Sequence, residues 1–258
     1  MSLRQCDDPD SPAVRVIYLK ERNFEMLKTD LIMKNPLRLM GHQTDDILGD
    51  GGFGAVLARA GVGKTALLVQ LAINAQLRNQ NVLHIALKDP VKKVCLWYDE
   101  VFRNIIQHYD VPDHDKLWEE IIPHRFIMTF RVEGFSVPVL EERLTGLMEQ
   151  GIFVPKMIVI DGFPFQDDIR KPLEDLKKMA GTHGFQVWFT VTTHRHETPG
   201  SDGFPPAFSP VADLFEVAIQ LLPQGKEILI KSIKGGPENV DNSPLRLNTS
   251  TLLLIDKA

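Results

Sequence analysis

The residues Ala58-Arg-Ala-Gly-Val-Gly-Lys-Thr65 decide how the rest of the chain is interpreted. A short apolar run, Ala55–Ala58, precedes them, and a helical pattern of apolar residues over Lys64–Leu77 follows them. Glycines at 61 and 63 allow the backbone to approach a phosphate chain closely, so that several N–H groups converge on it. A strand, a glycine-rich turn, Lys-Thr and a helix in this order are typical of a phosphate-binding loop.

The chemistry of this loop assigns a role to each of its residues. Lys64 places a positive charge against the terminal phosphates, and the Thr65 hydroxyl, at the start of the helix, is a ligand for Mg²⁺. Ala58 stands where the usual pattern has glycine. The predicted nucleotide-binding residues are Arg59, Ala60, Gly61, Val62, Gly63, Lys64, Thr65 and Ala66.

A second element supports a nucleotide site. Lys156–Asp161 is a nearly all-apolar strand that ends in an acid. A carboxylate at the end of a buried strand holds Mg²⁺ beside the Thr hydroxyl in proteins with such loops. Asp161 with Thr65 is therefore the predicted metal site. The alternative is that Asp161-Gly162 only forms the turn after the strand.

Strand and helix patterns alternate over most of the chain. This alternation predicts an α/β fold with a doubly wound, mostly parallel sheet and right-handed crossovers. Near the end, Phe215–Leu222 and Glu227–Ile233 predict a hairpin, and Thr251–Ile255 a last strand, which together form an antiparallel extension. Further strands are predicted at 82–87, 125–130 and 186–192, and helices at 91–108, 115–122, 138–150 and 167–180.

With these elements in place, the chain resembles the RecA-like ATPases, in the branch of KaiC and the DnaB helicase. Phosphate-binding loops of this branch often begin with Ala-Arg, as Ala58-Arg59 does. The stretch Asp45–Gly52 is similar to the family's entry segment, and Gln186–His194 to the strand that ends in its polar sensor. Ala212–Val217 and the hairpin after it are similar to the family's final strands. The resemblance covers residues 37–256.

The resemblance implies a RecA-like domain that binds ATP and Mg²⁺, with Lys64 and Asp161 in catalytic positions. His194 stands where the family usually has a glutamine sensor, at the start of the long irregular segment Thr193–Pro210. Ordering of this segment through His194 on nucleotide binding would give a switch. Family members use a Lys or Arg of the last hairpin to contact ATP bound by a neighbouring subunit. Lys231 and Lys234 are the candidates, and the alternative is that they are solvated hairpin lysines.

One departure from the family concerns hydrolysis. Family members end the second strand with a glutamate that polarises the attacking water, whereas this chain has Lys88. An ammonium group cannot accept a proton at neutral pH unless its pKa is strongly lowered. Asp89 is one residue further on, and neighbouring side chains on a strand point to opposite faces. We therefore predict an ATP-binding, switch-like protein with weak or no hydrolysis.

Composition limits the partners and the location. The 258 residues have 43% hydrophobic and 24% charged residues, and the formal net charge is -5. Residues 1–13 predict a flexible tail without an apolar leader, and residues 14–258 a single cytoplasmic domain with no membrane partner.

A homo-oligomer or a protein partner is compatible with the resemblance. An active ATPase acting on DNA is the alternative function, but the negative charge does not favour it. A third hypothesis is a protein that kept the fold and lost nucleotide binding.

A glycine-rich segment and a histidine-containing loop resemble other binding motifs. Gly49–Val56 fits the glycine pattern of dinucleotide-binding proteins and of protein kinases, but a strand follows it where the dinucleotide fold needs a helix, and the chain contains neither HRD nor DFG. These glycines are predicted to form the turn into the first strand. His194, His196 and Glu197 lack a further ligand at fitting spacing, so no metal site is predicted there.

Overall fold

The computed structural model describes residues 25–33, 47–165, 168–194, 200–225, 227–235 and 245–255. The chain divides into two compact units, Met1–Asn35 and Pro36–Ala258. In the first unit, residues 25–33 form a helix. The predicted boundary between a tail and a domain at residues 13 and 14 lies outside the described residues. None of the described helices is long and apolar enough to cross a membrane.

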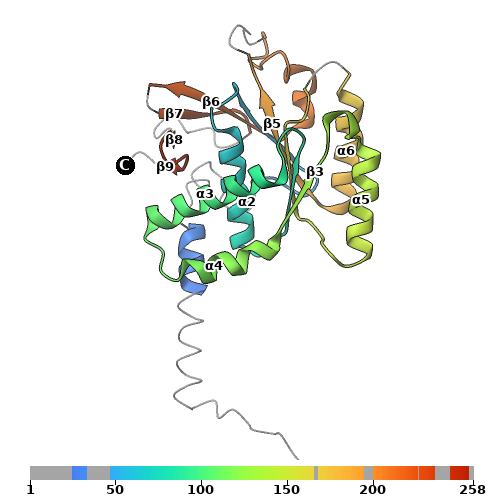
Figure 1. Ribbon diagram of the computed structural model, residues 1–258. Coiled ribbons are helices and arrows are strands. Elements are labelled where there is room, and N and C mark those ends of the chain that lie inside the picture. Colours follow the sequence, from blue (N-terminus) through green and yellow to red (C-terminus); the bar gives the residue numbers. More distant parts are fainter. Residues whose placement is uncertain are drawn as a thin grey trace, which may run out of the picture. The chain divides into compact units, whose positions relative to one another are not determined.

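The second unit contains one nine-stranded sheet with the order β3-β2-β4-β5-β1-β6-β7-β8-β9. The six strands from β3 to β6 in this order run parallel to their neighbours, and β6 to β9 pair antiparallel (Figure 1). The prediction of a mostly parallel α/β sheet with an antiparallel C-terminal extension is therefore confirmed. The parallel strands are β1 (Phe53–Ala58), β2 (Val82–Ala86), β3 (Arg125–Thr129), β4 (Met157–Asp161), β5 (Gln186–Thr192) and β6 (Val217–Gln224).

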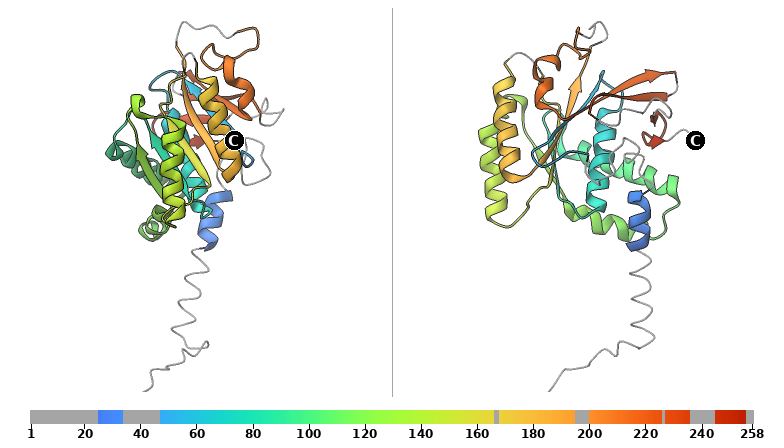
Figure 2. Two further views of the ribbon diagram at one scale, coloured as in Figure 1. Left: turned by 90° about the vertical axis from the view of Figure 1, so that its right-hand side faces the viewer. Right: turned by 180° about the vertical axis from the view of Figure 1, so that it is seen from behind.

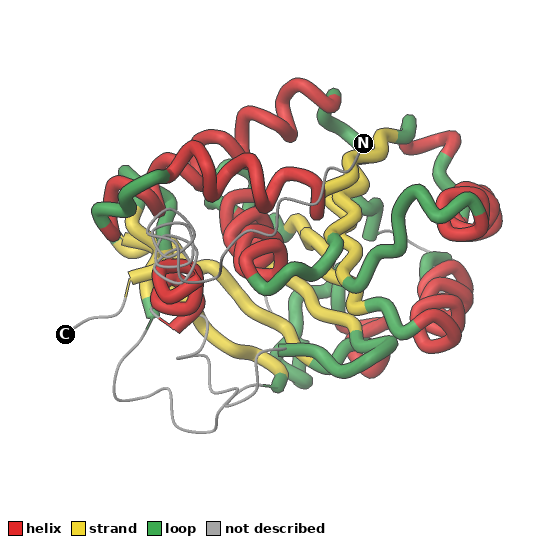
Figure 3. Tube along the Cα trace, turned by 90° about the horizontal axis from the view of Figure 1, so that it is seen from below, coloured by secondary structure: helices red, strands yellow, loops and turns green. Residues whose placement is uncertain are grey.

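Helices cover both faces of the parallel strands, as Figure 3 shows from below. On one face lie α2 (Lys64–Leu77) and α3 (Val91–Tyr109), with α4 (His114–Ile121) beside them. On the other face lie α5 (Val137–Glu149) and α6 (Arg170–His183). The helix α2 contacts β1, β2, β4, β5 and α3, and this explains why its sequence is apolar on nearly every side.

The helix ends follow from local sequence. Pro138 lies in the first turn of α5, where its missing N–H has no partner to lose. Asp110 ends α3 and Gly184 ends α6, both in the left-handed conformation that closes a helix. The helix α6 begins at Arg170, three residues later than predicted, because Asp168 before it takes a positive φ of 61°.

The antiparallel extension consists of the hairpin β6–β7 (Glu227–Lys234), then β8 (Arg246–Asn248) and β9 (Leu254–Ile255). Figure 2 shows the hairpin on the side of the sheet away from α5 and α6. The predicted last strand is shorter than expected, since residues 251–253 form a turn and its exit. No sequence pattern indicated β8, a three-residue strand that pairing with β7 defines. Of the predicted irregular segment 193–210, the end forms a short 3-10 helix, Ser209–Leu214.

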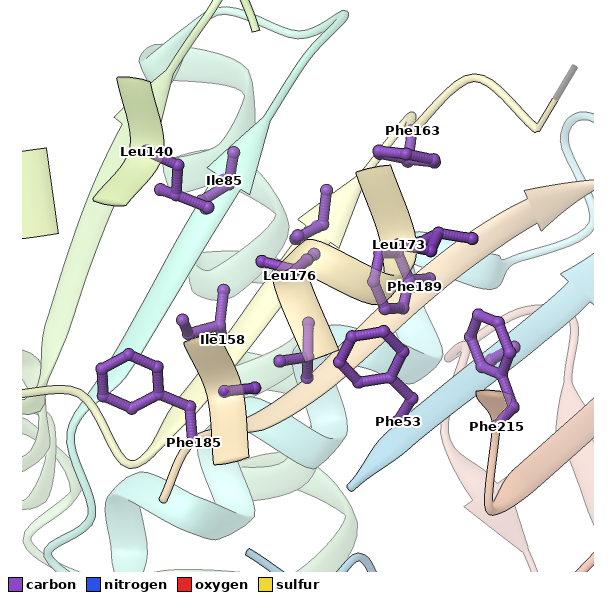
Figure 4. Packing of buried hydrophobic residues seen from close by; sticks show 14 of the residues in the cluster. Phe53, Ile85, Leu140, Ile158, Phe163, Leu173, Leu176, Phe185, Phe189 and Phe215 are labelled. Atoms are coloured by element: carbon purple, nitrogen blue, oxygen red, sulfur yellow. The ribbon is translucent and has the colours of Figure 1, made fainter. Parts of the chain in front are cut away.

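A large core cluster lies between the sheet and the pair α5–α6. Phe53, Phe189 and Phe215 pack at centroid distances of 5.1 to 5.6 Å (Figure 4). Leu140 of α5 and Leu173 and Leu176 of α6 close the cluster from the helical side, and all three are fully buried. This cluster packs one face of the parallel strands against α5 and α6, and the carboxyl ends of these strands form one edge of the sheet. In open α/β sheets that edge is where ligands bind.

Candidate functional site

The predicted phosphate-binding loop connects β1 to α2 at the carboxyl edge of the sheet. Gly61 and Gly63 have φ angles of 76° and 100°, values that residues with a side chain rarely adopt. The helix α2 begins at Lys64 with no side-chain cap and no acidic residue in its first turn, so no side chain of the helix itself offsets the positive end of its dipole. The loop therefore has the backbone form of an anion site.

Lys64 folds back over this loop. Its Nζ donates hydrogen bonds to the carbonyl oxygens of Ala58 at 2.9 Å and of Arg59 at 3.0 Å. Burial lowers the pKa of the Lys64 ammonium below its ordinary value, Asp161 acts in the opposite direction, and Lys88 lowers the pKa further. The two carbonyl oxygens and Asp161 therefore offset the burial of this cation only in part, and an anionic ligand would add to the compensation.

Asp161 ends β4 beside the first residues of α2. Thr65 Oγ1 donates to Asp161 Oδ2 at 2.7 Å, and Thr190 Oγ1 donates to Asp161 Oδ1 at 2.8 Å. The N–H of Gly162 in turn donates to Thr190 Oγ1 at 2.9 Å. The two predicted metal ligands are therefore in direct contact, and Thr190 of the neighbouring strand β5 orients the carboxylate.

This donor set fits Mg²⁺, which is bound in phosphate sites by one or two protein oxygens and completes its octahedron with water and phosphate. A hydroxyl and a carboxylate oxygen are hard ligands of the required kind. In the part of the chain that the structure describes, no group of three or more His, Cys, Asp or Glu residues could hold a metal ion by itself. The fit thus depends on a phosphate as a further ligand.

Thr190 is a site residue that the sequence analysis missed. Ile160 of β4 pairs in register with Phe189 of β5, so the next residues on the two strands, Asp161 and Thr190, lie side by side. Thr190 is buried within an otherwise apolar stretch of β5. A single polar residue in a buried strand needs a hydrogen-bond partner, and this requirement, with the parallel register, was the available indication.

Leu247 of β8 is the second residue that was missed. A Cβ placed on Gly63 would lie only 2.8 Å from Leu247 Cδ2. The side chain of Leu247 is fully buried, and Gln70 of α2 holds the following segment through hydrogen bonds with Leu252 and Leu254. The antiparallel extension therefore supports the phosphate-binding loop from the side.

Lys88 and Asp89 follow β2 next to Asp161. The N–H of Leu87 donates to the Asp161 carbonyl at 3.0 Å, which keeps the two chains paired one residue beyond the strand. Lys88 is exposed, and its aliphatic stem lies against Gly162. Asp89, the acid that could replace a missing glutamate, forms an ion pair with Lys93 at 2.9 Å. The position after β2, where the resemblance would place a glutamate, is thus occupied by the cation Lys88.

The other residues predicted for the site are His194, Lys231 and Lys234. His194 is exposed, two residues after the end of β5, and residues 195–199 lie outside the described residues. Lys231 is exposed on β7. Lys234 is partly buried, and its Nζ donates to the Ala212 carbonyl at 2.6 Å. His196 and Glu197 are not among the described residues.

The glycine-rich segment before β1 lies at the opposite, amino end of that strand, where Gly49, Gly51 and Gly52 form the predicted turn and the Gly52 N–H donates to the Gly49 carbonyl. After Asp161, Phe163 and Phe165 pack on Phe189 at 5.7 and 6.0 Å. Phe163 is buried in the core, and Phe165 is partly buried and packs against it, so both rings are engaged by the core.

Comparison of the chain with models of known protein families and with curated protein sequences found no match.

Proposed function

We propose that this chain is a RecA-like protein that binds ATP with Mg²⁺, hydrolyses it slowly or not at all, and acts as a nucleotide-dependent regulatory switch. The observation that carries the proposal is the hydrogen bond between Thr65 Oγ1 and Asp161 Oδ2, at 2.7 Å across 96 residues of sequence. The sequence analysis had assigned Thr65 from the phosphate-binding loop, and Asp161 from the apolar strand that it ends and from its position downstream of that loop.

The roles follow from position. Backbone amides over Arg59–Thr65 would surround the phosphates, Lys64 would neutralise them, and Thr65 with Asp161 would hold the ion. Bound Mg²⁺ would neutralise charge on the terminal phosphates. Thr190 orients the Asp161 carboxylate through its hydrogen bond.

Slow hydrolysis is proposed because of Lys88. A water-orienting residue contributes orders of magnitude to phosphoryl transfer, and an ammonium group cannot accept hydrogen bonds from water. Asp89 forms its ion pair with Lys93, which lies outside the site, so this contact does not place it to replace the missing glutamate. Phosphate binding does not need the missing group.

An active motor on DNA is the competing proposal. It is less well supported, because the chain has a formal net charge of -5 and the rings of the loop after Asp161 pack in or against the core. Salt-sensitive binding of single-stranded DNA in the presence of ATP would favour it over a switch.

The test of slow hydrolysis is phosphate release from saturating MgATP by the wild type, by Lys88→Glu and by the neutral control Lys88→Gln. We expect a wild-type rate on the order of 10⁻³ s⁻¹ or slower, as for a nucleotide site without its full catalytic set. The Lys88→Glu variant should be faster than both others, since its carboxylate can orient water. A wild-type rate above about 1 s⁻¹, typical of an efficient enzyme, would contradict the proposal.

A further inference from the structure

Lys88 lies beside the metal end of the site. A Cβ placed on Gly162 would lie 3.1 Å from Lys88 Cγ and 3.3 Å from Lys88 Cδ, so the lysine stem rests on the residue that follows Asp161. The Leu87–Asp161 hydrogen bond fixes the backbone just before it. The stem is thus held in place although the ammonium is exposed.

The charges around Lys88 are unbalanced. Within the described residues it makes no ion pair, while the neighbouring Asp89 pairs with Lys93. Lys64, whose Nζ lies on the carbonyl oxygens of Ala58 and Arg59, is a second cation of the site, and the Asp161 strand lies between β1 and β2 in the sheet. A highly charged anion bound between two ammonium groups is stabilised by both.

The strand order shows which end of a nucleotide Lys88 would meet. From the phosphate-binding loop on β1, the sheet continues through β5 and β4 to β2. The amides of the loop would hold the inner phosphates, and Thr65 with Asp161 would hold the Mg²⁺ that neutralises the terminal ones, so the Asp161 strand would lie nearest the terminal phosphate. Lys88, on the far side of Asp161 from the loop, lies beyond that point.

We propose that Lys88 is a ligand of the terminal phosphate and makes the site select nucleoside triphosphates over diphosphates. This inference rests on the proposed function and deepens it, because it turns the cation that slows hydrolysis into the residue that reads the third phosphate. A switch that responds to ATP but not to ADP needs such a contact.

The experiment is calorimetric titration with the Mg²⁺ complexes of a non-hydrolysable ATP analogue and of ADP. We expect Lys88→Ala to weaken binding of the triphosphate by about 10-fold and to leave ADP affinity unchanged, as for loss of one charge-assisted contact. Lys88→Arg should keep the preference. Lys92→Ala, which removes an exposed lysine at the start of α3, is the matched control and should change neither affinity.

The outcomes separate the two proposals. If the wild type binds the triphosphate and Lys88→Ala leaves that affinity unchanged, or weakens both ligands equally, Lys88 does not select the terminal phosphate and only this inference is overturned. If the wild type binds neither ligand, the proposed function fails as well. Circular dichroism of each variant checks that it is folded, and Lys88 is exposed, so no loss of fold is expected.

Discussion

His84 makes the stability of this protein depend on pH. It lies fully buried on β2, with Nδ1 3.2 Å from the Tyr98 hydroxyl, and its Nε2 makes no hydrogen bond with any described residue. Burial lowers the pKa of His84 from 6.5 to about 4, while Asp161 acts against the shift and Arg125 adds to it. The imidazole is therefore neutral in the folded protein at pH 7.

The sign of the effect follows from the direction of this shift. Below pH 6.5 the unfolded chain takes up a proton on His84 that the folded chain does not accept until the pH approaches 4. The free energy of unfolding therefore falls as the pH falls through this window. From pH 7.5 to pH 5 the loss from this one residue is about 2 kcal/mol.

The assay is urea unfolding followed by circular dichroism at pH 7.5 and pH 5, for the wild type, His84→Gln and the exposed-histidine control His108→Gln. Glutamine does not titrate and can still hydrogen-bond to Tyr98. We expect the free energy lost between the two pH values to be about 2 kcal/mol smaller in His84→Gln than in the wild type. An equal loss in these two proteins would refute the reasoning, whereas His108→Gln should match the wild type.

Two further predictions concern the site's supports. Thr190→Val leaves the Asp161 oxygen and the Gly162 N–H without their hydrogen bonds, so it should lower the free energy of unfolding by about 1 to 3 kcal/mol, measured by urea unfolding with Thr190→Ser as the retained-hydroxyl control. Gly63→Ala should lower the melting temperature more than Gly61→Ala, because the new Cβ at 63 meets Leu247 at 2.8 Å whereas nothing lies within 4 Å at 61. Equal melting temperatures for the two alanine variants would exclude Leu247 as the support of the loop.

The parallel part of the fold could be predicted because each of its elements has a strong local pattern. The runs at β4 and β5 are apolar on both faces, as strands covered by helices on both sides must be. Loop and helix at Gly63–Lys64 were identified by residue type alone. The strand β8 could not be found in this way, since three residues carry no period and their pairing with β7 is a tertiary contact.

Site residues could be predicted where the chemistry of phosphate and metal binding requires a particular residue type. They could not be predicted where their role depends on tertiary contacts. Lys64, Thr65 and Asp161 belong to a recognisable pattern, and the structure brings Thr65 and Asp161 together. Thr190 orients the same carboxylate, but its role depends on the register between β4 and β5, which no local pattern specifies. Leu247 reaches Gly63 from the far end of the chain, so no spacing in the sequence pointed to it.

The central claim is that the loop at Ala58–Thr65 binds ATP with Mg²⁺, and titration calorimetry with MgATP tests it most directly. We predict that the wild type binds one nucleotide per chain, that omission of Mg²⁺ weakens binding, and that Lys64→Ala weakens it by at least about 10-fold. A folded wild type that shows no binding at about 1 mM MgATP, or a Lys64→Ala variant with unchanged affinity, would contradict the account.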